Sequence, residues 1–279
     1  MLDMLLQIDT YAEPTPSAAI DQAVMFARSC EARITALATH IDIRVPDNWL
    51  AEKLLGVSRM AEVEENKSLQ TAHASIKYFE EAARKGNVPC DSMVVRADFN
   101  AVGDCVARHA RTRDLTLVAA TNPGGSQRAV AEDVAFGAGR PVLVYNPQTA
   151  QLPTASLDRV SVLWDGSRCS ARAVADARPI LAKAREVAIV TIIGEKASAA
   201  TGAASDLLRH LKAHGLSAQV QEIKHLGAIG ASIDAHVATY SPQLLVMGAY
   251  GTSRLKEFVL GGATEHILDN LRIPAILSH

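Results

Sequence analysis

The stretch LLVMGAYGTSRLKEFVLGGATEHILDN, residues 244–270, joins a short apolar run to a helix-like segment through a glycine-rich connection. The apolar run, residues 244–247, has the length and composition of a buried strand. Four glycines lie in or beside the connection, namely Gly248, Gly251, Gly261 and Gly262. A strand that leads into a helix in this way indicates a parallel α/β sheet.

The chain contains the same order of strands and helices twice. In each half, an apolar run ends in an acid, Asp9 or Asp165, and a helix start follows, with Ser170 expected as the N-cap in the second half. Further strands are predicted at 34–41, 92–95, 115–119 and 142–144, and again at 187–193, 218–223, 244–247 and 275–277. Strands that alternate with helices predict two tandem α/β domains, each a parallel sheet with helices on both faces.

A segment rich in proline and small polar residues separates two predicted domains. The predicted segments are an N-terminal domain (1–147), a linker rich in small polar residues and proline (148–158), and a C-terminal domain (159–279). The last strand of each domain follows a proline, Pro141 or Pro274, which is typical of an edge strand. We expect these edges to pair, 142–144 against 275–277, as an internal pseudo-dimer. A further homodimer and unknown protein partners are left open.

The two halves differ in length at two places. Asp9 and Val118 are 109 positions apart, whereas Asp165 and Val246 are 81 apart, so the first half carries 28 more residues, within a long helical stretch. Between the fourth strand and the final proline, the first half is five residues shorter than the second. The missing residues fall where the second half has its glycines.

Residues with ligand-binding chemistry follow two predicted strands of the second half. Ligands of open parallel sheets bind beyond the carboxyl ends of the strands, and Asp165 and Gly248 both lie at such ends. Gly261 and Gly262 run into a helix start, whose free N–H groups and dipole suit a phosphate. This combination favours a nucleotide pocket, and the alternative is that the glycines only form tight turns.

The glycine spacing resembles the nucleotide-binding pattern of the universal stress protein family, G-x2-G-x9-G-[ST] after the fourth strand. Gly248, Gly251 and Gly261 match this spacing, and VSVLWDGSRCSARAV, residues 160–174, resembles the family's first strand, acid and helix start. The first half resembles the family more faintly, so the whole chain resembles a tandem universal stress protein. The resemblance implies an adenine nucleotide alpha hydrolase-like, Rossmann-like domain with five parallel strands in the order 3-2-1-4-5. It also implies ATP, or AMP or ADP, between the first and fourth strands, with Mg²⁺ bound to the nucleotide.

The resemblance further implies which residues contact the nucleotide. Asp165 would contact the nucleoside, residues 190–192 would line the adenine pocket, and residues 261–264 would cradle the phosphates. The full set of candidates is Leu163, Asp165, Thr191, Met247, Gly248, Tyr250, Gly251, Gly261, Gly262, Ala263 and Thr264. Tyr250 either stacks on the nucleotide or is simply exposed.

Two departures from the family pattern are visible. Gly262 stands where the family has Ser or Thr, so a hydroxyl is lost and phosphate affinity is expected to weaken, although Thr264 offers a replacement hydroxyl. In the first half, TNPGGS at 121–126 replaces the motif, while Asp9 remains. We therefore expect one ATP per chain, in the second domain, with the first pocket closed or altered for another ligand.

Charge and composition narrow the class of partner. The net charge is -2, the isoelectric point is about 6.5, and no long run of Lys or Arg occurs, so neither a nucleic acid nor a membrane is an expected partner. No leader or membrane span is recognisable, and four scattered cysteines fit reduced thiols. We expect a cytoplasmic protein.

Other motifs do not account for the chain. It has no G-x4-G-K-[ST] loop, and FGAG at 136–139 precedes a strand, which is wrong for a dinucleotide-binding fingerprint. His210 and His214 lie four apart on a helical stretch without further ligands, so no metal site is expected. Cys169, near a helix start, is either a reactive thiol or a small residue.

The function that these patterns favour is nucleotide binding without dedicated catalysis. No general base or nucleophile is evident, so no catalytic residue is predicted, and at most slow ATP hydrolysis is expected. We interpret the chain as an ATP-binding sensor or regulator in stress adaptation. The alternative is a nucleotide-free interaction scaffold with both pockets vestigial.

Overall fold

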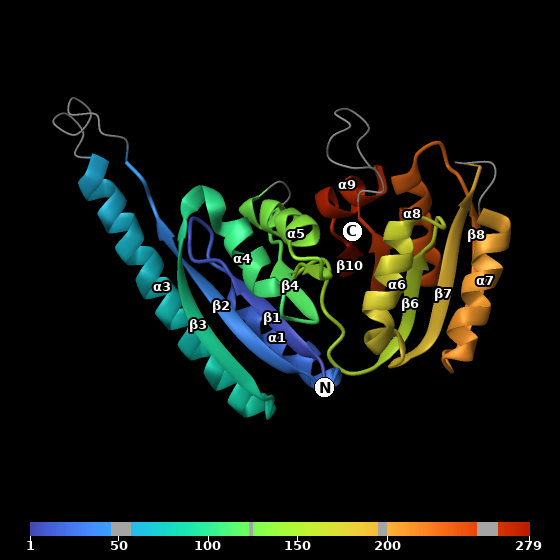
Figure 1. Cartoon of the computed structure of the whole chain (residues 1–279), viewed down its shortest axis with the longest axis horizontal. Coiled ribbons are helices and arrows are strands. Elements are labelled where there is room, and N and C mark those ends of the chain that lie inside the picture. The colour runs from blue at the N-terminus through green and yellow to red at the C-terminus, as the bar shows by residue number, and fades with distance from the viewer. Residues whose placement is uncertain (46–56, 123–124, 195–199, 250–261) are drawn as a thin grey trace.

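One sheet runs through both halves of the chain (Figure 1). This computed structural model describes residues 1–45, 57–122, 125–194, 200–249 and 262–279. Within these residues the sheet has ten strands in the order β3-β2-β1-β4-β5-β10-β9-β6-β7-β8. The strands are β1 (Asp3–Ile8), β2 (Arg33–Asp42), β3 (Cys90–Asp98), β4 (Leu115–Ala119), β5 (Val142–Tyr145), β6 (Leu157–Leu163), β7 (Ala184–Ile193), β8 (Ala218–Lys224), β9 (Leu244–Gly248) and β10 (Ala275–Ser278).

Each half of the sheet has the same topology. Strands β3-β2-β1-β4-β5 and strands β8-β7-β6-β9-β10 both follow the order 3-2-1-4-5, and neighbours within each half are parallel. The expected α/β fold with this strand order is therefore confirmed. Strands β1, β4 and β9 are almost wholly buried because helices cover both faces of the sheet. The two outermost strands, β3 and β8, are half exposed.

The helices form one layer on each face of the sheet. One face carries α1 (Ser17–Ser29), α3 (Val57–Gly86), α6 (Arg168–Leu181) and α7 (Ala200–Ala213). The other face carries α4 (Val102–Ala110), which follows a short 3₁₀ helix, η1 (Phe99–Ala101), and then α5 (Ser126–Gly137), α8 (Ile229–Tyr240) and α9 (Gly262–Asp269). Among the described helices, none combines the length and hydrophobicity that crossing a lipid bilayer requires.

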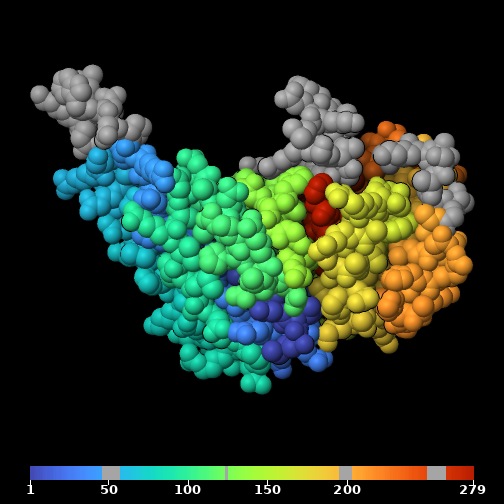
Figure 2. Space-filling view, in the orientation of Figure 1, coloured from blue at the N-terminus to red at the C-terminus, as the bar shows by residue number. Residues whose placement is uncertain are grey.

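The two halves join where β5 pairs with β10. The pairing is antiparallel, with Val144 opposite Ala275 and Val142 opposite Leu277, the residues expected from the sequence to meet. Each hydrophobic layer contains residues of both halves, so two cores extend across this seam. Figure 2 shows the red C-terminal residues between the yellow-green surface of the first half and the yellow surface of α6.

The segment that connects the halves is anchored to the first half. The Asn146 side chain donates to the carbonyl of Ala120 (3.0 Å) and accepts from the backbone of Gln148 (2.9 Å). Leu152 is 4% exposed, and its backbone N–H donates to Gln22. Strand β6 begins at Leu157, so the last two residues of the predicted linker belong to a strand.

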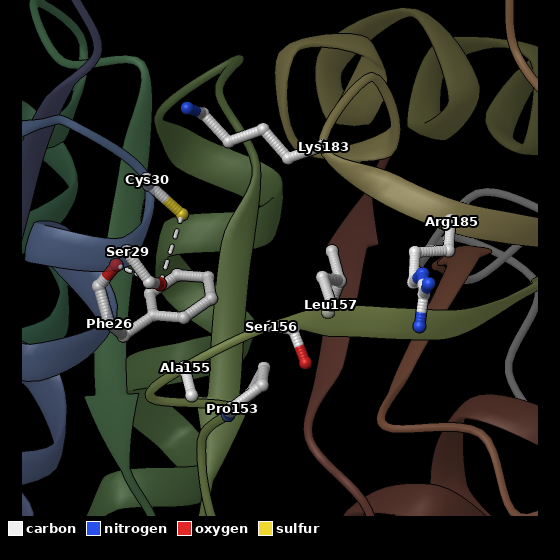
Figure 3. Close-up of a pocket in the computed structure, with 9 residues that line it drawn as sticks. All are labelled: Phe26, Ser29, Cys30, Pro153, Ala155, Ser156, Leu157, Lys183 and Arg185. Carbon is white, nitrogen blue, oxygen red and sulfur yellow. Dashed lines mark hydrogen bonds between the residues drawn. The ribbon is translucent and has the colours of Figure 1, made fainter.

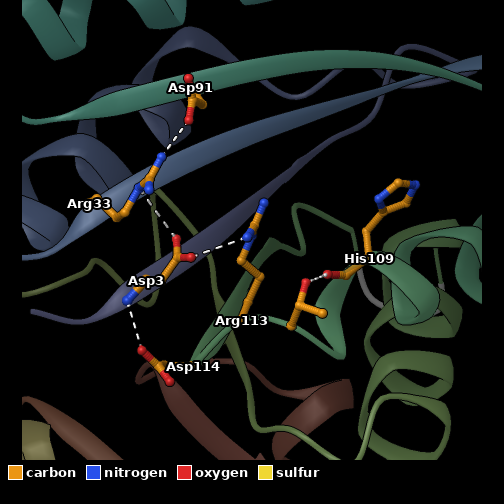
Figure 4. A network of polar contacts seen from close by, with 7 residues as sticks. Asp3, Arg33, Asp91, His109, Arg113 and Asp114 are labelled. Atoms are coloured by element: carbon orange, nitrogen blue, oxygen red, sulfur yellow. Dashed lines mark hydrogen bonds and ion pairs between the residues drawn. The ribbon is translucent and has the colours of Figure 1, made fainter.

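Charged side chains tie together the strands at the amino-terminal edge of the first half (Figure 4). Asp3 accepts from Arg113 at 3.1 Å and lies 3.8 Å from Arg33, which also pairs with Asp91. The backbone N–H of Asp3 donates to Asp114 at 2.9 Å. These contacts join β1, β2, β3 and the turn before β4, at the opposite edge from the predicted ligand-binding end.

Candidate functional site

Asp165 and Gly248 lie at the same edge of the sheet, beyond neighbouring strands. In the register of β6 with β9, Leu163 lies opposite Met247, so the residues that follow them emerge side by side. Asp165 is exposed. The carboxyl ends of the parallel strands lie at this edge, which is where open parallel sheets bind their ligands.

The turn between β6 and α6 shapes the surroundings of Asp165. Gly166 has a φ of 75°, a left-handed conformation that favours glycine. The backbone N–H of Ser167 donates to Asp165 Oδ1 at 2.9 Å. Ser167 is also the N-cap of α6, because its Oγ accepts from the backbone N–H of Ser170 at 3.2 Å. The expectation that Ser170 caps this helix is wrong, since Ser170 lies within its first turn.

The carboxyl group of Asp165 is held in its ionised form. Partial burial raises its pKa, but hydrogen bonds from Ser167 and Ser170 oppose this effect, and the net pKa lies below the ordinary value. An exposed, ionised carboxylate at this edge is an acceptor for hydroxyl or amino groups of a ligand.

Gly248 is required by helix packing. A Cβ on Gly248 would lie 2.6 Å from the carbonyl carbon of Cys169 and from the nitrogen of Ser170, both backbone atoms of α6. The first turn of α6 therefore packs directly on the end of β9. Cys169 is 3% exposed, with its Sγ 3.7 Å from His279 Nδ1, so its thiol lies in the interior and not at a pocket mouth.

The predicted adenine-pocket residues lie on both faces of the sheet. Leu163 and Met247 pack into the layer under α8 and α9, together with Ile192. Since side chains alternate along a strand, the neighbouring Thr191 points to the opposite face, where it is 3% exposed. On the Leu163 face, only the main chain of Thr191 is available to a ligand.

The first turn of α9 is only partly open. Gly262 is exposed, Ala263 is half-buried and Thr264 is 2% exposed. Because Gly262 is exposed and Thr264 is buried, the main chain at Gly262 is more accessible to a phosphate than the Thr264 hydroxyl. The remaining candidates Tyr250, Gly251 and Gly261 lie outside the described residues.

An arginine of the first half reaches this helix, and the sequence analysis missed it. Arg128, on α5, pairs with Asp269 and lies 3.9 Å from Glu265, both on α9. It also pairs with Glu132 on its own helix at 3.0 Å. The sequence carries one indication of this contact. The predicted pairing of the last strands brings together the helices that precede them in the two halves.

The corresponding acid of the first half has different surroundings. Asp9 is 3% exposed, and its Oδ1 accepts from Gln7 Nε2 at 2.8 Å. Burial raises its pKa to about 6, although hydrogen bonds from Gln7 and Gln127 lower it. Gln127 is itself buried in the first turn of α5, so the first half fills this position with its own side chains.

A separate hollow lies between the halves at the other edge of the sheet (Figure 3). It has a volume of about 260 Å³, and its lining includes Phe26, Cys30, Leu157, Lys183 and Arg185. Burial raises the pKa of the Cys30 thiol to about 11, so the thiol is protonated at neutral pH. The hollow contains none of the predicted site residues.

The described residues contain no group of three or more His, Cys, Asp or Glu side chains that could hold a metal ion. The rings of His210 and His214 contact each other edge to face, with centroids 4.7 Å apart. This pair therefore packs as an aromatic contact at the end of α7.

Comparisons with known proteins agree with this fold. The model of the universal stress protein family matches residues 157–279. The chain is similar to the structure of a universal stress protein from Archaeoglobus fulgidus DSM 4304, with a TM-score of 0.74 and 14% identity over 99% of this chain and 96% of that one. It is also similar to a functionally unknown protein from Pseudomonas aeruginosa PAO1, with a TM-score of 0.58 and 12% identity over 98% and 92% of the two chains.

At these identities, the structural likeness shows the fold alone. A search of curated protein sequences gave no match. The family assignment therefore depends on the family model, which covers the half that carries Asp165, Gly248 and α9. Residues 157–279 thus match the universal stress protein family.

Proposed function

We propose that the C-terminal half binds ATP, with its Mg²⁺, at the carboxyl edge of β6 and β9, and that occupancy makes the chain a nucleotide-dependent regulator in stress adaptation. The observation that carries this proposal is the contrast between the two halves. Asp165 is exposed and ionised, whereas Asp9 is buried with a raised pKa. One open site per chain follows from this contrast.

The residues present fit an adenine nucleotide. Asp165 would accept hydrogen bonds from the ribose hydroxyls, and the half-buried, apolar Leu163 suits the flat base, beside the more deeply buried Met247. The exposed main chain at Gly262, at the start of α9, suits the phosphates. Mg²⁺ would neutralise part of the phosphate charge when bound. The match of residues 157–279 to the universal stress protein family supports the role in stress adaptation.

The proposal is tested by titrating the whole chain with ATP and Mg²⁺ in a calorimeter. We expect one site per chain, and we expect Asp165→Ala to weaken ATP binding by about 10- to 150-fold, because hydrogen bonds to a charged group contribute about 1.5–3 kcal/mol. Asp9→Asn is the matched control, since it changes the corresponding acid in the closed half. Equal losses in both variants, or two sites per chain, would contradict the proposal.

Nucleotide occupancy in the expression host provides an independent test. Denaturing the freshly purified chain should release ATP, ADP or AMP, which mass spectrometry would detect. An empty chain that also shows no thermal shift with ATP would instead support the nucleotide-free scaffold. A specific feature favours that second candidate, because α3 has 30 residues, whereas the described helices of the second half have at most 14, and α3 exposes Met60 and Val63.

A further inference from the structure

The ionic contacts of Arg128 cross from one half of the chain to the other. Its guanidinium pairs with Asp269, at the end of α9, and lies 3.9 Å from Glu265, in the first turn of the same helix. The side chains of Arg128 and Glu265 are 22% and 31% exposed, so solvent screens this contact only in part. Figure 1 shows α5 and α9 near the seam between the halves.

The internal repeat gives the position of Arg128 a counterpart in the second half. Pro141 and Pro274 begin equivalent segments, and counting back the same 13 positions from each reaches Arg128 in the first half and Gly261 in the second. Counting back nine positions reaches Glu132 and Glu265. The acid is thus present in both halves, whereas the arginine occurs in one half and a motif glycine in the other.

This asymmetry has an electrostatic consequence at α9. Among the described residues, three carboxylates lie near the Arg128 guanidinium, namely those of Glu132, Glu265 and Asp269. Glu265 lies three residues after Gly262, at the helix end that would receive phosphates. A carboxylate in this position repels a phosphate, and a neighbouring guanidinium offsets that repulsion.

We propose that Arg128 is a positioning residue for the nucleotide of the C-terminal half. It offsets part of the negative charge of the acids of α9 and fixes this helix so that a triphosphate can approach its amino end. The N-terminal half, whose own acid is buried, thereby supplies part of the charge balance of the other half's site. This inference rests on the proposed ATP binding at α9.

The test compares binding of ATP and of adenosine by whole-chain variants. Because adenosine carries no phosphate, Arg128→Gln should weaken ATP binding by roughly three- to ten-fold and adenosine binding by less than two-fold. The conservative Arg128→Lys should retain most of the affinity for ATP. Adding Glu265→Gln to Arg128→Gln should restore much of the ATP binding, because it removes the acid in the first turn of α9, which would otherwise repel the phosphates. Arg209→Gln, which removes an exposed arginine paired with Asp206 on α7, is the matched control and should bind like the wild type.

The outcomes separate the two proposals. If the wild-type chain binds no ATP, the proposed function fails. If the wild type binds ATP and Arg128→Gln binds it equally well, the inference about Arg128 is overturned while the proposed function stands. Equal weakening of ATP and adenosine, or no recovery in the double variant, also overturns it, because the arginine would then only support the packing of α9.

Discussion

Asp9 and Asp165 show how the same residue at equivalent positions acquires different chemistry. Both follow the first strand of a half, but Asp9 is buried by its own half, and Asp165 is exposed. Burial penalises the charged form, whereas hydrogen bonds from Ser167 favour it. The pKa of the acid therefore rises in one half and falls in the other.

The raised pKa of Asp9 predicts a pH dependence of folding stability. The pKa rises from 3.8 to about 6, so its contribution is fully present below 3.8 and is lost as the pH rises through 6. The expected loss is roughly 3 kcal/mol in the free energy of unfolding, at 1.36 kcal/mol for each pKa unit. Urea unfolding of the wild type and of Asp9→Asn, between pH 4 and pH 7, measures it.

The comparison with Asp9→Asn isolates this effect, because asparagine does not titrate. The difference in stability between the two chains should change in favour of the variant as the pH rises. Asp165→Asn is the control, because the lowered pKa of Asp165 contributes stability that is lost only below the unfolded value of 3.8, so its difference from the wild type should stay nearly constant between pH 4 and pH 7. A constant difference between wild type and Asp9→Asn across this pH range would show that Asp9 is ionised in the folded chain.

Gly248→Ala tests whether this glycine is required for packing. The new Cβ would lie 2.6 Å from two backbone atoms of α6, which cannot move as a flexible side chain can. We expect a loss of about 1–3 kcal/mol in the free energy of unfolding, measured by thermal denaturation. Gly262→Ala is the control, because its Cβ would meet only a side-chain carbon of Ile229 at 3.2 Å. Equal stability of the two variants would argue against the packing role.

At the scale of elements, the start of α6 links helix stability to the site. Ser167 caps this helix and also donates to Asp165. Ser167→Ala should cost about 1 kcal/mol in the free energy of unfolding, as loss of an N-cap hydroxyl does. Chemical denaturation of Ser167→Ala and Ser170→Ala provides the measurement. A larger loss at Ser170 would indicate that Ser170, and not Ser167, caps the helix.

The strands and helices were largely predictable from the sequence, because their patterns are local. Apolar runs and helical periodicity gave the order of the elements in both halves, and the structure places β1, β4 and β9 at the predicted runs. The sequence does not distinguish Ser167 from Ser170 as the N-cap of α6, because both hydroxyl groups lie near the helix start. Only the backbone dihedral angles there decide which of them caps the helix.

At the scale of the whole molecule, the continuous cores predict cooperative unfolding. Each hydrophobic layer includes residues of β5 and β10, so neither half can unfold without exposing apolar surface of the other. Hydrogen exchange at increasing urea concentration should release β1 and β9 together, in one transition. Separate transitions for the two halves would show that the seam contributes little to stability.

The sequence by itself determined the repeat and the edge at which Asp165 and Gly248 lie, because these follow from short-range periodicity and chain direction, whereas the strand order was implied by the family resemblance. The tertiary structure alone decided that Asp9 is buried, that Gly248 receives the backbone of α6, and that Arg128 reaches α9. These facts depend on contacts between residues far apart in the chain. Burial, close approach and charge pairing have no local pattern in the sequence, since each is a property of two surfaces that meet only after folding.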